Sequence, residues 1–198
     1  MILYVETNFP LSIAKGQDPE AERLLLNLPS SVNIAIPSIC CLEAVSVLQE
    51  EQKYRKRFEQ DLKIQINEAQ RNLSSSYARS VAFHLEQALP QYMELAKEVK
   101  ARLLQALDNL ATKAELFPLT ADMLRESLLP GLIQDGTDNL ILHCILGHAR
   151  SHPTQVKVFL SGNTRDFGTL VVQQALRDVG VEDYFSRTQD FLGWLRSQ

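Results

Sequence analysis

Short apolar runs alternate with helical segments along this chain, and this alternation limits the possible folds more than any other feature. The run ILYV at residues 2–5 has no polar position, which fits a strand buried on both faces. VNIAI at 32–36 and VKVFLSG at 156–162 also have the composition of strands. Strands that alternate with helices indicate an α/β fold with a mostly parallel sheet.

Apolar residues recur every three or four positions between residues 39 and 110. The pattern predicts one long helix from about 39 to 73, a break at the serines 74–76, and a return helix from 81 to 110 interrupted near Pro90. We therefore expect residues 50–115 to form an antiparallel helical hairpin.

The remaining segments are shorter. LFPLT at 116–120 is a candidate strand, and we expect it at an edge of the sheet because Pro118 cannot donate a backbone hydrogen bond to a neighbouring strand. A helix is expected from about 138 to 149, another that ends at Gly180, a short strand at 181–185 and a terminal helix at 190–196. A chain of 198 residues is expected to form one domain, here with the helical hairpin as an addition to it.

Composition narrows the function classes. No apolar run reaches the length of a membrane-spanning helix and the start lacks the features of a secretory signal, so we expect a cytoplasmic protein with no membrane contact. Cys40, Cys41 and Cys144 have no zinc-site spacing and indicate buried thiols. The formal net charge of −4 argues against a uniformly basic surface that coats nucleic acid, but it is compatible with a local basic patch.

Acidic and amide side chains follow the predicted strands. They are Glu6, Glu43, Asp135, Asp138, Asn163 and Asp166. In a parallel sheet these positions lie toward the carboxyl ends of the strands, where open α/β sheets place their sites. Two like charges about 4 Å apart repel by roughly 4 kcal/mol at an effective dielectric near 20. An ion that offsets this repulsion, held by oxygen ligands alone, would be Mg²⁺ or Mn²⁺.

Four sequence pieces together resemble the PIN domain, a family of metal-dependent nucleases. They are VETNF, IPSICCLEA, DNLILHCILGHA and FLSGNTRDF, and they cover residues 1–49 and 131–185. The resemblance implies a three-layer α/β/α sandwich with a central parallel sheet, here with the hairpin of residues 50–115 inserted into a single domain of residues 1–198. It also implies metal-dependent hydrolysis of a phosphodiester, usually in RNA.

The family's acids can be matched residue by residue. Glu6, Glu43 and Asp138 match the first three acids, and Asn163 or Asp166 matches the fourth region, with Phe167 completing the pattern. The resemblance thus implies Glu6, Glu43, Asp138 and Asp166 as catalytic residues. These four, with Asp135 and Asn163, form the expected set of Mg²⁺ or Mn²⁺ ligands.

Other polar residues are candidates for supporting roles. Thr7 and Asn8 are expected to orient Glu6, although an ordinary turn explains them equally well. Thr164 and Arg165 are expected beside the site, Arg165 to contact a phosphate. Asp135 is either an extra ligand or the capping acid of the following helix.

The sequence departs from the family at two points, which leaves alternatives open. The first acid is glutamate where the family normally has aspartate, and the hairpin is longer than in compact members. One interpretation is a Mg²⁺- or Mn²⁺-dependent ribonuclease, for which the toxin-like partner of a toxin–antitoxin pair is one role. The other is a catalytically weak or inactive module that binds RNA or a protein partner. An aspartyl phosphatase is disfavoured, because ETN stands where DxD would be needed. A protein partner bound through the hairpin and a homodimer stay open.

Two further features have ordinary explanations. The basic run KYRKR at 53–57 is flanked by acids and is better explained as a solvated helix face than as a phosphate-binding patch. We interpret His84, His143, His148 and His152 as structural or surface residues, not as metal ligands.

Overall fold

The computed structural model describes residues 1–129 and 131–198. The chain forms two compact units, one of residues 1–44 with 103–198 and the other of residues 45–102. The predicted division, a hairpin insertion within a single domain, stays a prediction.

The first unit is built on a parallel five-stranded sheet. The strands are β1 (Ile2–Val5), β2 (Asn33–Pro37), β3 (Glu115–Phe117), β4 (Lys157–Leu160) and β5 (Val181–Phe185), in the order β3-β2-β1-β4-β5. The central strand β1 is completely buried, as its unbroken apolar run predicts. Strand β3 lies at an edge, where Pro118 prevents it from continuing.

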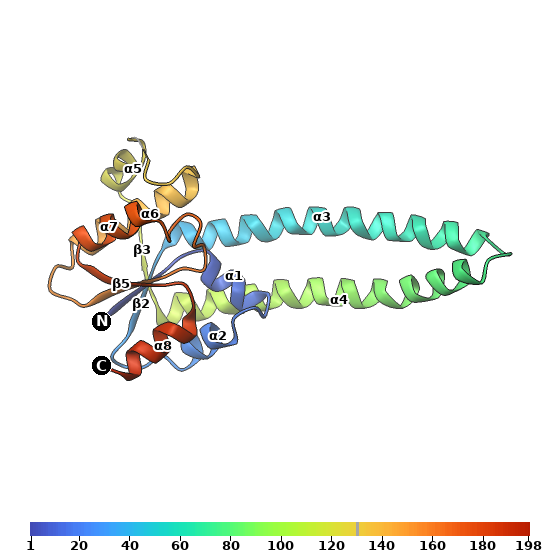
Figure 1. The fold of residues 1–198 in the computed structure, drawn as a ribbon, viewed down its shortest axis with the longest axis horizontal. Coiled ribbons are helices and arrows are strands. Elements are labelled where there is room, and N and C mark those ends of the chain that lie inside the picture. Colours follow the sequence, from blue (N-terminus) through green and yellow to red (C-terminus); the bar gives the residue numbers. More distant parts are fainter. Residues whose placement is uncertain (130) are drawn as a thin grey trace. The chain divides into compact units, whose positions relative to one another are not determined.

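Helices cover both faces of this sheet. They are α1 (Asn8–Ala14), α2 (Pro19–Leu26), α5 (Ala121–Ser127), α6 (Gly136–Arg150), α7 (Leu170–Asp178) and α8 (Thr188–Arg196). Helices α6 and α7 lie on one face and α2 and α8 on the other (Figure 1). The three-layer α/β/α architecture implied by the resemblance is confirmed.

The second unit consists of parts of two long helices, α3 (Ser38–Arg71) and α4 (Ser76–Lys113). Within residues 45–102 they pack antiparallel, with the rings of Phe58 and Tyr92 5.2 Å apart (Figure 1). The predicted interruption at Pro90 is wrong, because α4 continues through it. Pro90 is exposed, so its ring does not disturb the packing, and it removes only one backbone hydrogen bond from a helix of 38 residues.

Three short helices, α1, α2 and α5, were not expected. Helix α1 contains Pro10 and is buried on most sides, so its seven residues show no amphipathic pattern. Helices α2 and α5 do carry start signals: the side chain of Asp18 caps α2 with Pro19 in its first turn, and Thr120 caps α5. Within the described residues, no helix has the length and apolar character needed to cross a membrane.

Candidate active site at the carboxyl edge of the sheet

Glu6 is a buried acid at the carboxyl end of the central strand, with only 2% of its surface exposed. Strand β1 pairs with β4 so that Val5 lies opposite Leu160, which places Glu6 beside Ser161. The Ser161 hydroxyl donates to Oε1 of Glu6 at 2.9 Å, and the Asn8 backbone N–H donates to Oε2 at 2.7 Å. Ser161 was not predicted as a site residue, because its role depends on a strand register that the sequence does not state.

The pKa of Glu6 is raised to about 7. Burial is the main cause, because a carboxylate loses its hydration there, and the neighbouring carboxyls of Asp138 and Glu43 add to the effect. The hydrogen bonds from Asn8 and Ser161 favour the charged form but do not outweigh burial. Glu6 therefore binds a proton readily near neutral pH when no cation is nearby.

Glu43 lies in the first turns of α3 and is partly buried. The hydroxyl of Thr7 donates a hydrogen bond to its Oε2. Thr7 thus orients Glu43, where we expected it to orient Glu6. Asn8 does hold Glu6, but through its backbone N–H, while the Asn8 side chain is exposed.

Asp138 joins the site from the first turn of α6. Asn163 donates from its side-chain amide to Oδ2 of Asp138 at 3.0 Å, and Oδ1 of Asn163 accepts from the Asp166 N–H at 3.3 Å. The pKa of Asp138 is raised to about 6, chiefly by burial and then by the carboxyls of Asp135, Asp166 and Glu43. The causes of this shift include three acids and no basic side chain, so negative charge accumulates around Asp138.

Asp135 caps the start of helix α6, which is one of the two roles that the sequence left open for it. Its Oδ1 accepts hydrogen bonds from the backbone N–H groups of Thr137 (2.8 Å) and Asp138 (3.1 Å). This cap fixes the start of α6, and with it the position of Asp138. Whether Asp135 also binds a metal stays a prediction.

A cavity of about 520 Å³ opens beside Asp138. It is lined by Leu132, Ile133, Gln134, Asp135, Asp138, Arg165, Asp166 and Thr169. Arg165 is thus placed where its guanidinium can reach an anionic ligand. Thr164 is exposed, and its backbone makes turn hydrogen bonds with Gly162 and Gly168.

We refer to Glu6, Glu43, Asp138, Asn163 and Asp166 as the acidic site. In the described chain, no three of its carboxyls bring one oxygen each to within 4.8 Å of one another. Mg²⁺ keeps several of its waters and is bound through one or two carboxylates together with substrate phosphates, so it does not require three carboxyls in direct contact with it. The oxygen donors and the surplus negative charge therefore fit a hydrated hard cation.

Comparison with known proteins places this site in a family. No curated protein and no solved structure matches the chain. The sequence profile of a family described as PIN domain matches residues 3–167, from β1 to the loop after β4. Because this match covers most of the chain and includes every residue of the acidic site, the chain belongs to the PIN domain family, whose members are generally metal-dependent nucleases.

Proposed function

We propose that the chain is a Mg²⁺- or Mn²⁺-dependent ribonuclease whose catalytic residues are Glu6, Glu43, Asp138 and Asp166. One observation supports this most: carboxyls from four separate segments gather at the carboxyl edge of the sheet, where they raise the pKa of Glu6 and of Asp138, beside a cavity of about 520 Å³. Such a surplus of buried negative charge would be costly without a cation to offset it.

The metal ligands of this proposal are Glu6, Glu43, Asp138 and Asp166. A Mg²⁺ or Mn²⁺ ion held there would lower the pKa of a bound water and stabilise the charge that develops on the phosphate. Thr7 and Asn163 keep Glu43 and Asp138 oriented, since each donates a hydrogen bond to one carboxylate oxygen.

Arg165 is the residue we assign to the substrate. It lies in the cavity wall with Asp138 and Asp166, and a guanidinium binds phosphate oxygens in a bidentate manner. It would hold the scissile phosphate against the repulsion of the neighbouring acids.

Cleavage of single-stranded RNA in Mn²⁺ tests the proposal. Asp138→Asn and Glu43→Gln should each lower the rate at least about a hundredfold, since loss of even an outer partner of a ligand costs 10- to 100-fold. Glu182→Gln, at an exposed position in β5, is the matched control and should cleave like the wild type. Equal rates for all four proteins, persisting in excess chelator, would mean a contaminating nuclease and would refute the assignment.

A second candidate function is a binding module without efficient catalysis. Two observations favour it: both oxygens of Glu6 are already engaged by Asn8 and Ser161, and α4 exposes Tyr77 (83%) and Phe83 (59%), which suits a protein partner. RNA binding without cleavage, measured by fluorescence anisotropy, would favour this function. Light scattering would show whether the partner is a second copy of the chain.

The toxin-like role is an extension of the ribonuclease proposal. A toxin of this kind would arrest growth when expressed alone, and the arrest would require the acidic site. Growth arrest with the wild type but not with Asp138→Asn would support it. Cys40, Cys41 and Cys144 are free thiols, which agrees with the cytoplasmic location we propose.

A further inference from the structure

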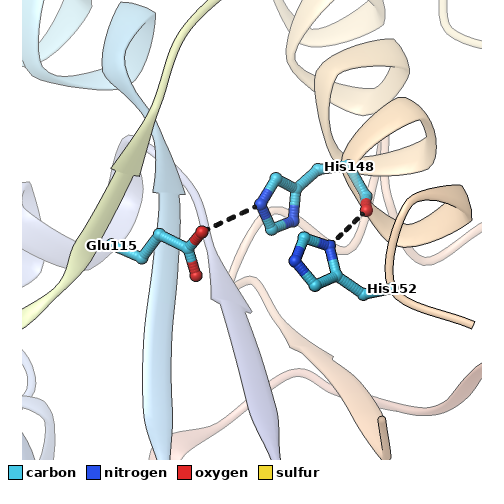
Figure 2. A group of neighbouring side chains, drawn as sticks. All are labelled: Glu115, His148 and His152. Atoms are coloured by element: carbon cyan, nitrogen blue, oxygen red, sulfur yellow. Dashed lines mark hydrogen bonds and ion pairs between the residues drawn. The ribbon is translucent and has the colours of Figure 1, made fainter. Parts of the chain in front are cut away.

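A second cluster of potential metal ligands lies at the opposite end of helix α6 from Asp138. It consists of Glu115 at the first position of β3, His148 in the last turn of α6 and His152 just beyond that helix. Each residue offers one ligand atom, and these atoms all lie within 4.8 Å of one another. Figure 2 shows the three side chains facing one another.

His148 is held rigidly in this cluster. Its ring is buried, stacks on Phe117 with the ring centroids 4.1 Å apart, and has its Nδ1 2.9 Å from the Tyr4 hydroxyl. With Nδ1 engaged, Nε2 is the atom directed at Glu115, 3.2 Å from Oε1 (Figure 2). This contact is a hydrogen bond in which the Nε2–H of His148 donates to the carboxylate, so a bound cation would replace that proton. Two ligand atoms on one tetrahedral zinc ion lie about 3.4 Å apart, so the pair would need little movement.

The other two residues are also oriented by partners. Nδ1 of His152 lies 2.9 Å from the backbone carbonyl of His148, so this nitrogen carries the proton and Nε2 keeps its lone pair. The Asn33 amide donates to Oε2 of Glu115 at 2.9 Å, which leaves Oε1 for the cluster. Buried Lys157 donates to the carbonyl of His152 at 2.8 Å and fixes the backbone there. Each ligand thus has the outer hydrogen bond that metal-binding side chains usually have.

We propose that Glu115, His148 and His152 bind one divalent cation of the zinc class, with water in the fourth position. Two imidazoles and one carboxylate are a donor set that selects zinc over Mg²⁺. His152 is half-buried and the Glu115 side chain is 39% exposed, so solvent can reach the open position and the side chains can close the remaining gap. This site is independent of the acidic site and of the proposed nuclease activity.

The experiment is a titration of the full chain with Co²⁺, a zinc substitute whose four-coordinate complexes absorb strongly in the visible. A large excess of Mg²⁺ keeps oxygen-donor sites occupied. The expected result is a set of intense bands that saturates at one equivalent of Co²⁺ and is abolished by Zn²⁺. Absence of these bands in the wild type would overturn the proposal.

Variants test whether Glu115, His148 and His152 are the residues that bind Co²⁺. His152→Gln and Glu115→Gln each remove one ligand from a solvent-accessible position and should weaken Co²⁺ binding at least about a hundredfold, beyond the 10- to 100-fold typical of an outer partner. Asn33→Ala, which removes the positioning hydrogen bond, should weaken it about tenfold. His84→Gln, at an exposed position of α4, is the matched control and should bind like the wild type. Unchanged binding in His152→Gln, or equal losses in His152→Gln and His84→Gln, would show that the cluster is only a hydrogen-bonded group.

Discussion

Glu6→Gln should stabilise the metal-free protein at neutral and alkaline pH. Glu6 is buried and its pKa is raised from the ordinary 4.5 to about 7. Between these two values the folded state binds a proton that the unfolded state has released. The free energy of unfolding therefore falls as the pH rises through this window.

The size of the effect follows from the two pKa values. Their difference of about 2.5 units corresponds to roughly 3 kcal/mol, at 1.36 kcal/mol per unit. The uncharged amide of glutamine avoids this cost. The variant should thus be more stable than the wild type by about 3 kcal/mol near pH 8, but by less than about 1 kcal/mol near pH 5, where Glu6 is protonated in the fold.

Urea unfolding in excess chelator at both pH values measures the difference. Asp138 also has a raised pKa. Its charge helps to raise the pKa of Glu6, and this repulsion acts on both carboxyls, so removing the Glu6 charge should lower the pKa of Asp138 and add to the stabilisation near pH 8. Glu182→Gln, at an exposed position, is the control and should show no such difference. Saturating Mn²⁺ should reverse the order, because only the wild type keeps the charged ligand. A stability difference that does not change with pH, or a variant less stable near pH 8, would refute this reasoning.

Three further outcomes are expected. Mn²⁺ at a hundredfold excess over its dissociation constant should raise the free energy of unfolding by about 2.7 kcal/mol, and Asp138→Asn should lose most of this gain in a thermal-shift assay. If the site has adapted to the longer acid, Glu6→Asp should lower the rate of RNA cleavage about a hundredfold, because a displacement near 1 Å costs about that much. A higher rate in Glu6→Asp would instead indicate that the wild-type site has lost activity and that the shorter acid partly restores it. Replacing residues 45–102 with a short linker should leave a folded sheet unit by circular dichroism and alter RNA or partner selection, whereas a chain that cannot fold would show that the hairpin is core structure.

The sequence was enough to predict the sheet and the location of the acids. Glu6 follows β1 directly and Asn163 and Asp166 follow β4, so parallel strands place them at one edge of the sheet. Their proximity also requires that β1 and β4 be neighbours, as they are in the structure. Asp138 required one more feature, the helix start that Asp135 caps.

The contacts within the site depend on geometry that the sequence does not contain. Ser161 meets Glu6 because Val5 pairs with Leu160, and a different register would have placed another residue there. Thr7 reaches Glu43 because of where α3 begins beside β1. Thr7 and Asn8 therefore lie beside the acids as expected, but Thr7 contacts Glu43 and not Glu6.

The histidine cluster shows why local spacing alone is insufficient. His148 and His152 are four residues apart, a separation that places two side chains on one helix face but is equally found for structural histidines, so the sequence alone did not indicate a metal site there. The third member, Glu115, joins them only because β3 pairs with β2 in one particular register, with Ala35 opposite Glu115. A slip of one residue would turn Glu115 to the other face of the sheet and bring Leu116 toward the histidines. The same register places Phe117, two positions along the strand, against the His148 ring. The register of β3 thus decides whether Glu115 can meet the two histidines, and an ion bound by the three residues would hold β3 to the end of α6.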